Sequence, residues 1–268
     1  MKHTVLVTCQ NCDFDKQLAE IFAQEGHNVF TIKPGEDPQA VATQIEAQAG
    51  KLDFLLDTTD YLHKGDNFMI QTDTHGNCVA SQATDNDCIA NLVIEDDCMA
   101  NSVIDNDCIT NSVIDSGSLA QNIRDTIVDS VGIDAEIIED VYRNNVLVSM
   151  RLLEKFLPLL DKGSGKRLFY VSSAKASIGE TKLPNQYAYV MAKAALHQFI
   201  QMTRNKLAPS GYTFRIFDPL KGSLDPIKAA QSAYQYIMRR RTIENHNPLR
   251  DDEENIVMRD ALGTLHGW

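Results

Sequence analysis

Short apolar runs rich in β-branched residues alternate along this chain with amphipathic stretches, and this alternation constrains its fold more than any other feature. Apolar residues at helical spacing predict helices, and the β-branched runs predict buried strands. Strands are expected at Thr4–Thr8, His27–Ile32, Leu52–Leu56, Arg167–Ser172, Thr213–Phe217 and Asn255–Arg259. Helices are expected at Lys16–Glu25, Pro38–Ala49, Ala135–Leu160, Gln186–Leu207 and Pro226–Arg240. The pattern predicts an α/β fold: a doubly wound, mainly parallel sheet with helices on its faces.

One segment breaks this pattern, because residues 85–114 hold three near-copies of a decapeptide, DNDCIANLVI, EDDCMANSVI and DNDCITNSVI. Apolar pairs recur in it every five residues, a period that fits neither a helix nor a coiled coil. Short strands between acidic turns are expected, either as a small β-solenoid, which we prefer, or as a meander. Since the α/β pattern resumes after Ile123, we predict one domain over residues 1–268 with an inserted repetitive β segment over residues 70–130.

The formal net charge of −12 is concentrated in and around this segment. Between Gly65 and Ile123 there is no Lys or Arg, whereas ten Asp or Glu residues fall there. Such a field repels phosphate backbones and anionic lipid, so neither nucleic acid nor a membrane surface is an expected partner. The acidic turns lack the glycine-punctuated spacing of calcium loops, so we interpret them as solvated turns rather than as Ca²⁺ sites.

Apolar runs and cysteines indicate a cytoplasmic protein. The sequence has no run of eighteen apolar residues and enters a strand pattern at its start, so neither a membrane span nor a cleaved signal is expected. Six cysteines in 268 residues do not make a disulfide scaffold. We interpret the single C-x-x-C pair, Cys9 and Cys12, as small buried side chains rather than a redox pair, and we expect no metal.

The most specific local pattern pairs Tyr189 with Lys193, four residues apart on a predicted helix, after a strand that ends in Ser172 and Ser173. At this spacing the two side chains share a helix face, so the ammonium can lie near the phenol. A nearby positive charge would lower the pKa of Tyr189 toward the range of a general acid or base. With a serine to hold an oxygen, this set could transfer a proton to an oxygen whose carbon gains or loses hydride.

These residues resemble the short-chain dehydrogenase/reductase family, in which a strand ending in Ser-Ser precedes a Tyr-x-x-x-Lys helix. Asn145 also lies thirteen residues before a proline, as the family's active-site Asn does. The resemblance covers the chain apart from about residues 66–133 and implies a Rossmann-like fold. It implies that Tyr189 transfers the proton and that Ser173 polarises the substrate oxygen. It further implies that Lys193 binds the nicotinamide ribose and tunes the tyrosine, and that Asn145 positions a relay water.

The departures from the family pattern lie on the cofactor side. The glycines of its TGxxxGxG opening are replaced by Cys9, Asp13 and Asp15, whose side chains obstruct a pyrophosphate. The aspartates would also repel it. The family's NNAG is Asp57-Thr-Thr-Asp60 here, and its PG after the sixth strand is Pro219-Leu220. Before the strand at Leu52–Leu56 the chain is too short for the family's usual extra strand and helix.

Lys33 stands at the end of the second strand, where an acidic residue would select NAD through its ribose hydroxyls. The bound dinucleotide could be NADP or NAD, and the charge of Lys33 favours NADP. The alternative interpretation of Lys33 is an ordinary solvated charge on the protein surface. The candidate cofactor contacts are Thr8, Lys33 and Lys193.

Together these features predict an NAD(P)-dependent oxidoreductase that acts on a small carbonyl or alcohol through the tetrad Asn145, Ser173, Tyr189 and Lys193. Two alternatives stay open: a non-catalytic relative that binds a ligand or a protein, and a lyase or isomerase that works without a nicotinamide. The lost glycines and the lost NNAG favour the non-catalytic relative, and the intact tetrad opposes it. A homodimer or homotetramer is expected, because the two long helices resemble those that pair across the family's dimer interfaces.

Overall fold

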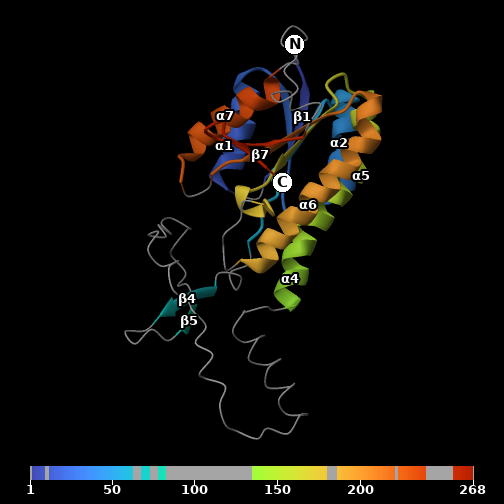
Figure 1. Ribbon diagram of the computed structural model, residues 1–268. Coiled ribbons are helices and arrows are strands. Elements are labelled where there is room, and N and C mark those ends of the chain that lie inside the picture. The colour runs from blue at the N-terminus through green and yellow to red at the C-terminus, as the bar shows by residue number, and fades with distance from the viewer. Residues whose placement is uncertain are drawn as a thin grey trace, which may run out of the picture.

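A computed structural model describes residues 2–9, 12–62, 68–72, 78–82, 135–179, 186–220, 223–239 and 256–267. Within these ranges a seven-stranded sheet forms the centre of the molecule (Figure 1). Its strands are β1 (Thr4–Thr8), β2 (Asn28–Ile32), β3 (Phe54–Asp57), β6 (Arg167–Val171), β7 (Thr213–Asp218), β8 (Met258–Asp260) and β9 (Leu265–His266). Their order is β2-β1-β3-β6-β7-β8-β9, and all neighbours are parallel except β8 and β9. The predicted doubly wound α/β fold is confirmed.

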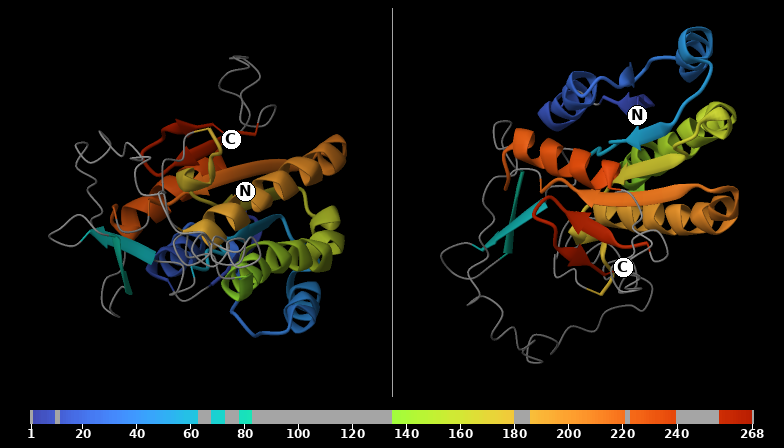
Figure 2. Two further views of the ribbon diagram at one scale, coloured as in Figure 1. Left: turned by 60° about the horizontal axis from the view of Figure 1, so that its bottom comes forward. Right: turned by 90° about the horizontal axis from the view of Figure 1, so that it is seen from above.

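Helices cover both faces of the sheet, as the view from above shows (Figure 2). One face is covered by α1 (Asp13–Gln24) and α7 (Pro226–Met238). The other is covered by α2 (Pro38–Ala49), α5 (Val148–Lys162) and α6 (Tyr187–Leu207), with α4 (Ala135–Tyr142) packed along α6. Because successive strand residues point to opposite faces, each strand feeds both cores. In the described part of the chain, no helix is long and apolar enough to cross a bilayer.

The elements follow the predicted order, with local differences. The helix α2 matches its predicted bounds, and its expected cap is present because Asp37 accepts a hydrogen bond from the Gln39 amide at 3.0 Å. The long helix region expected over Ala135–Leu160 is present, but a π-helical turn, η4 (Arg143–Leu147), lies inside it between α4 and α5. Such single π-turns inside α-helices are rare and often lie at functional sites.

The first half of the sheet is trimmed, as the short spacing before β3 predicts, because β2 is the edge strand. Two further strands, β4 (Phe68–Thr72) and β5 (Cys78–Gln82), pair with each other as a separate antiparallel hairpin. The three decapeptide copies lie outside the described residues. The choice between a solenoid and a meander, and the limits of the inserted segment, therefore stay predictions.

Asp53 joins three chain segments at the amino end of the sheet. Its buried carboxylate accepts hydrogen bonds from the Thr4 amide at 2.9 Å, the Ser164 amide at 2.8 Å and the Gly165 amide at 3.1 Å, and from Lys51 Nζ at 3.2 Å. Burial alone would raise the pKa of Asp53, but these donors outweigh it and lower the pKa to about 2.

Asp53→Asn should lower the free energy of unfolding by roughly 2 kcal/mol at neutral pH, because buried amides lose a charged acceptor. The folded-state pKa of Asp53 lies below its unfolded value of 3.8, so this stabilisation is complete above pH 4 and is lost as the pH falls toward 2. Urea denaturation of wild type and variant near pH 7 and near pH 3 should show the difference shrinking. A difference that is independent of pH would contradict this assignment.

Candidate active site

The candidate catalytic residues meet at the carboxyl ends of β3, β6 and β7, where ligands bind in doubly wound sheets. Of these residues, Ser173 and Tyr189 line a cavity of about 340 Å³. Its polar lining comes from the segment after β3, the end of β6, the first turns of α6 and the end of β7, and comprises Asp60, Ser172, Ser173, Lys175, Gln186, Tyr189, Asp218 and Ser223. Residues far apart in the sequence thus form one pocket with several polar groups in its lining.

A carboxylate lies between the tyrosine and the lysine of the helix motif. Tyr189 Oη donates a hydrogen bond to Asp60 Oδ1 at 2.7 Å, and Lys193 Nζ lies 3.1 Å from the same oxygen. The ammonium is also 5.7 Å from the centre of the Tyr189 ring. The spacing of four on α6 therefore places the two side chains on one face, as predicted, but Asp60 bridges their polar atoms.

All three N–H donors of Lys193 are engaged inside the protein. Besides Asp60, its Nζ donates to the carbonyl oxygens of Thr59 at 2.7 Å and Val171 at 3.2 Å. The side chain is fully buried, and an ammonium has three donors and no acceptor. In this arrangement Lys193 has no donor left for a ribose hydroxyl, so a nicotinamide ribose would have to share or replace one of these partners.

The expected lowering of the pKa of Tyr189 is wrong. Burial and the negative charge and hydrogen bond of Asp60 raise the pKa of Tyr189 well above its ordinary value, and Asp218 adds to the effect. A hydrogen bond with the Ser173 side chain acts in the opposite direction. The physical reason is that burial penalises the phenolate first, and the Asp60 carboxylate beside it then adds negative charge and accepts the phenolic hydrogen bond.

Asn145 is buried in η4 and turned toward the backbone of Tyr61 rather than toward Tyr189. Its Nδ2 donates to the Tyr61 carbonyl at 2.7 Å, and its Oδ1 accepts from the Tyr61 amide at 3.0 Å. Its own carbonyl accepts a hydrogen bond from Ser149 Oγ at 3.0 Å. The amide side chain thus clamps the segment that carries Asp60, which is a positioning function.

Ser173 lines the cavity and caps a short 3-10 turn by accepting from the Lys175 amide at 3.3 Å. The preceding Ser172 is buried and lies 2.6 Å from His197 Nε2. Burial, with a smaller contribution from Lys193, lowers the pKa of His197 to about 4, so this imidazole is neutral at physiological pH. Of the two serines, Ser173 is the one hydrogen-bonded to Tyr189.

Asp218, at the end of β7, is a second carboxylate of the cavity that the sequence analysis missed. It accepts from the amides of Ala174 at 2.7 Å and Leu220 at 2.8 Å, and burial raises its pKa. Leu220 has a positive φ of 53°, a conformation that favours the glycine of the family's PG pair. Asp60 was missed as a catalytic candidate because it appeared only as the last residue of a degenerate NNAG motif.

A second cavity, of about 310 Å³, lies at the same edge of the sheet and contains both remaining cofactor candidates, Thr8 and Lys33. The Thr8 hydroxyl accepts from the Thr58 amide at 2.8 Å, and the Thr58 hydroxyl donates to the Thr8 carbonyl. Lys33 is exposed, so its ammonium is accessible to a ligand phosphate. Thr59 lines this cavity and its neighbour Asp60 lines the first, so the two cavities adjoin one chain segment.

The residues fit a nicotinamide dinucleotide at its two ends and oppose it in the middle. The second cavity, with Lys33, suits the nucleotide end. The first cavity, with Ser173 and Tyr189, suits the reacting ring. The first turn of α1, however, carries Asp13 and Asp15, so the anion site that a helix N-terminus offers is already occupied by negative charge. Asp15 is fully buried, whereas Asp13 is exposed and lies 3.7 Å from Lys16 Nζ.

The C-x-x-C pair adds no chemistry to this region. Both Cys9 and Cys12 are free thiols, and Cys9 is buried in the core on the α1 face. Burial raises the pKa of Cys9 to about 11, with Asp15 adding to the effect, so its thiol stays protonated. Within the described ranges no group of three or more His, Cys, Asp or Glu is placed to hold a metal ion.

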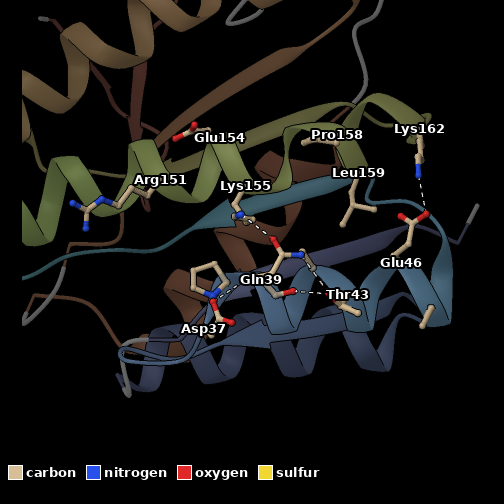
Figure 3. Close-up of a pocket in the computed structure, with 13 residues that line it drawn as sticks. Asp37, Gln39, Thr43, Glu46, Arg151, Glu154, Lys155, Pro158, Leu159 and Lys162 are labelled. Carbon is tan, nitrogen blue, oxygen red and sulfur yellow. Dashed lines mark hydrogen bonds and ion pairs between the residues drawn. The ribbon is translucent and has the colours of Figure 1, made fainter.

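A groove of about 860 Å³ between α2 and α5 is separate from this site (Figure 3). Its charged side chains pair across it: Lys155 Nζ donates to Gln39 Oε1 at 2.9 Å, and Lys162 Nζ to Glu46 Oε1 at 2.8 Å. These contacts join two helices at the protein surface, and we assign the groove no catalytic function.

No protein-family model and no curated protein sequence matches this chain. Solved structures do match. The NADPH-bound carbonyl reductase from chicken fatty liver is 14% identical with a TM-score of 0.60, over 100% of this chain and 99% of that one. The carbonyl reductase Sniffer of D. melanogaster is 16% identical with a TM-score of 0.58, over 99% and 88%. A candidate short-chain alcohol dehydrogenase from Burkholderia multivorans is 12% identical with a TM-score of 0.60, over the full length of both chains.

The chain therefore has the fold of short-chain dehydrogenases and carbonyl reductases, and the resemblance found in the sequence is confirmed at the level of the fold.

Proposed function

We propose that this chain is an NAD(P)-dependent oxidoreductase that acts on a small carbonyl compound or alcohol. The observation that carries the proposal is that Ser173 and Tyr189 line one cavity at the carboxyl edge of the sheet, with Lys193 paired to the same Asp60 oxygen that Tyr189 hydrogen-bonds. The fold alone does not specify an activity, so the argument rests on this site. The NADPH-bound chicken enzyme of the same fold supports the choice of cofactor class.

In the reductive direction, Tyr189 donates its phenolic proton to the substrate oxygen, and the Ser173 hydroxyl donates a hydrogen bond to the same oxygen. Lys193 holds the Asp60 carboxylate beside Tyr189 through its ion pair. When bound, the nicotinamide supplies the hydride to that carbon or accepts it. In the oxidative direction, the same groups take the proton from an alcohol.

Titration with NADH and NADPH, followed by nicotinamide fluorescence and thermal shift, tests this function directly. We expect saturable binding of at least one of them and then turnover of small aldehydes, ketones or alcohols from a substrate panel. Failure of both nucleotides to bind at millimolar concentration would refute the proposal.

Lys33 is proposed to favour NADPH over NADH through the charge of the extra phosphate. Lys33→Glu should therefore weaken NADPH binding severalfold and leave NADH binding nearly unchanged, since an exposed pair contributes modestly. Lys228→Glu, on the exposed surface of α7 and outside the lining of both cavities, serves as the matched control for net charge. Equal weakening of both nucleotides in Lys33→Glu would contradict the selective role.

One observation favours a second candidate, a lyase or isomerase that uses this site without a nicotinamide. Lys193 has its donors engaged by Asp60 and two carbonyls, and Asp13 and Asp15 oppose a diphosphate. Such an enzyme would turn over its substrate in nucleotide-free buffer, and its activity would not change on addition of NADPH.

We also propose that the chain assembles as a homodimer or homotetramer through its long helices. On α6, Met191 and Met202 are 54% and 64% exposed, a large apolar exposure for one helix of a soluble domain. Light scattering at micromolar concentration should give a mass of at least two chains. A monomer under these conditions would refute this assembly.

A further inference from the structure

We infer that Asp60 is the proton-exchange partner of Tyr189: the proton that Tyr189 passes to or from the substrate oxygen comes from or goes to the Asp60 carboxyl group. This inference rests on the proposed function and assigns a step in it to a residue outside the tetrad. It follows from the contacts of three side chains and from the charge that they can hold together.

The geometry provides a direct path for the proton. Tyr189 Oη and Asp60 Oδ1 are 2.7 Å apart with the tyrosine as donor, which is the distance of a short charge-assisted hydrogen bond. Asp60 lines the cavity, and its side chain is 10% exposed, so its carboxyl group can exchange protons with solvent. The path therefore runs from the substrate oxygen through Tyr189 to Asp60 and out through the cavity.

The charges in this cluster place the anion on Asp60 rather than on Tyr189. Lys193 supplies one positive charge, and Asp60 lies within ion-pair distance of it. A phenolate would add a second negative charge to a buried cluster that already faces Asp218, at a cost that one ammonium does not offset. His197 also interacts electrostatically with Lys193, and its imidazole is neutral, so it adds no charge to the cluster.

The proton balance is complete in both directions. When an alcohol is oxidised, its O–H bond breaks, its proton moves to Tyr189 Oη, and the phenolic proton moves to Asp60, which becomes a neutral carboxylic acid. The carbon loses hydride to the oxidised nicotinamide. When a carbonyl is reduced, protonated Asp60 reprotonates Tyr189 and ends as the carboxylate paired with Lys193. Tyr189 stays a neutral phenol before and after each step.

Asp60 is held for this exchange by the chain around it. The Asn145 side chain clamps both polar groups of the Tyr61 backbone, and Lys193 binds the Thr59 carbonyl. The residues on both sides of Asp60 are therefore fixed, so its carboxylate cannot swing out of the cavity without breaking buried hydrogen bonds.

The pairing is tested first by ultraviolet titration of tyrosine ionisation in the protein without substrate or nucleotide. Subtracting the Tyr189→Phe spectrum isolates Tyr189. In wild type, Tyr189 should not ionise before the protein unfolds, whereas in Asp60→Asn it should ionise at lower pH, because Lys193 then acts on the phenol alone.

A matched control exists in the same chain. Outside the cavity, Tyr212 Oη donates a hydrogen bond to Asp161 Oδ1 at 2.6 Å. Asp161→Asn should therefore lower the pH at which Tyr212 ionises and leave the ionisation of Tyr189 unchanged. An Asp60→Asn protein in which Tyr189 ionises as in wild type would overturn the inference.

Turnover then separates proton exchange from a structural role. In alcohol oxidation, which needs Asp60 as the carboxylate, Asp60→Asn should lower kcat by about 10²-fold or more and remove the acid limb of the pH–rate profile, while KM changes little. In Asp60→Gly, which leaves space beside Tyr189, added formate should restore part of kcat, and a structural role would not respond to formate.

The outcomes distinguish this inference from the proposed function. If wild type binds neither nicotinamide but the tyrosine titration shows the expected shift, the oxidoreductase proposal fails and the Asp60–Tyr189 pairing stands. If wild type turns over and Asp60→Asn matches its kcat and pH profile, the inference fails and the oxidoreductase proposal stands.

Discussion

Replacing Tyr189 by phenylalanine should lower turnover by about 10²- to 10⁴-fold while the protein stays folded, because the variant removes the proton donor and keeps the buried ring. The cost in stability should be about 1 kcal/mol, since Asp60 loses one hydrogen bond but keeps its ion pair with Lys193. Steady-state kinetics with saturating nucleotide and urea denaturation measure the two effects.

Tyr212→Phe is the control for this variant. It also removes a short phenol–carboxylate hydrogen bond, to Asp161, but it lies outside the cavity. It should lose similar stability and retain full turnover. A Tyr189→Phe protein with near wild-type kcat would contradict the role of Tyr189 as proton donor, whatever its stability.

Replacing Lys193 by methionine should produce the largest loss of stability, about 3–5 kcal/mol, because the variant leaves a carboxylate without its counter-ion in a buried site. Asp60 keeps its charge, and the Thr59 and Val171 carbonyls lose their donor. Urea denaturation at neutral pH measures the loss. The double variant Lys193→Met/Asp60→Asn should recover a substantial part of it, because both charges are then absent.

Lys162→Met is the control for this prediction. The Lys162–Glu46 pair has a similar separation of 2.8 Å, but both side chains are about half exposed, so its loss should cost less than about 1 kcal/mol. If Lys193→Met is no less stable than Lys162→Met, or if the double variant is no more stable than Lys193→Met alone, the ion pair does not hold this site together.

Local rules account for the part of the site that the sequence predicted. Tyr189 and Lys193 share a helix face because residues four apart on any α-helix do so. Ser173 reaches the same cavity because the carboxyl ends of parallel strands meet at one edge of the sheet. The trimmed edge at β2 follows from the number of residues before β3, which is a count that needs no structure.

Long-range contacts account for what the sequence did not predict. Asp60 lies 129 residues from Tyr189, and no pattern in either segment indicates their hydrogen bond. The amide of Asn145, on the π-turn η4, reaches across 84 residues to the Tyr61 backbone. The short strand β9, of two residues, contains too few residues to show alternation.

The sequence by itself determined the order of strands and helices, the mainly parallel sheet and the helix face that Tyr189 shares with Lys193. Each of these depends on the spacing of residues along the chain. Only the tertiary structure decided which atom carries the negative charge beside Tyr189, and it reversed the expected direction of that residue's pKa. The reason is physical: a pKa depends on burial and on charges within a few ångströms, and here the decisive charge, Asp60, comes from a distant segment.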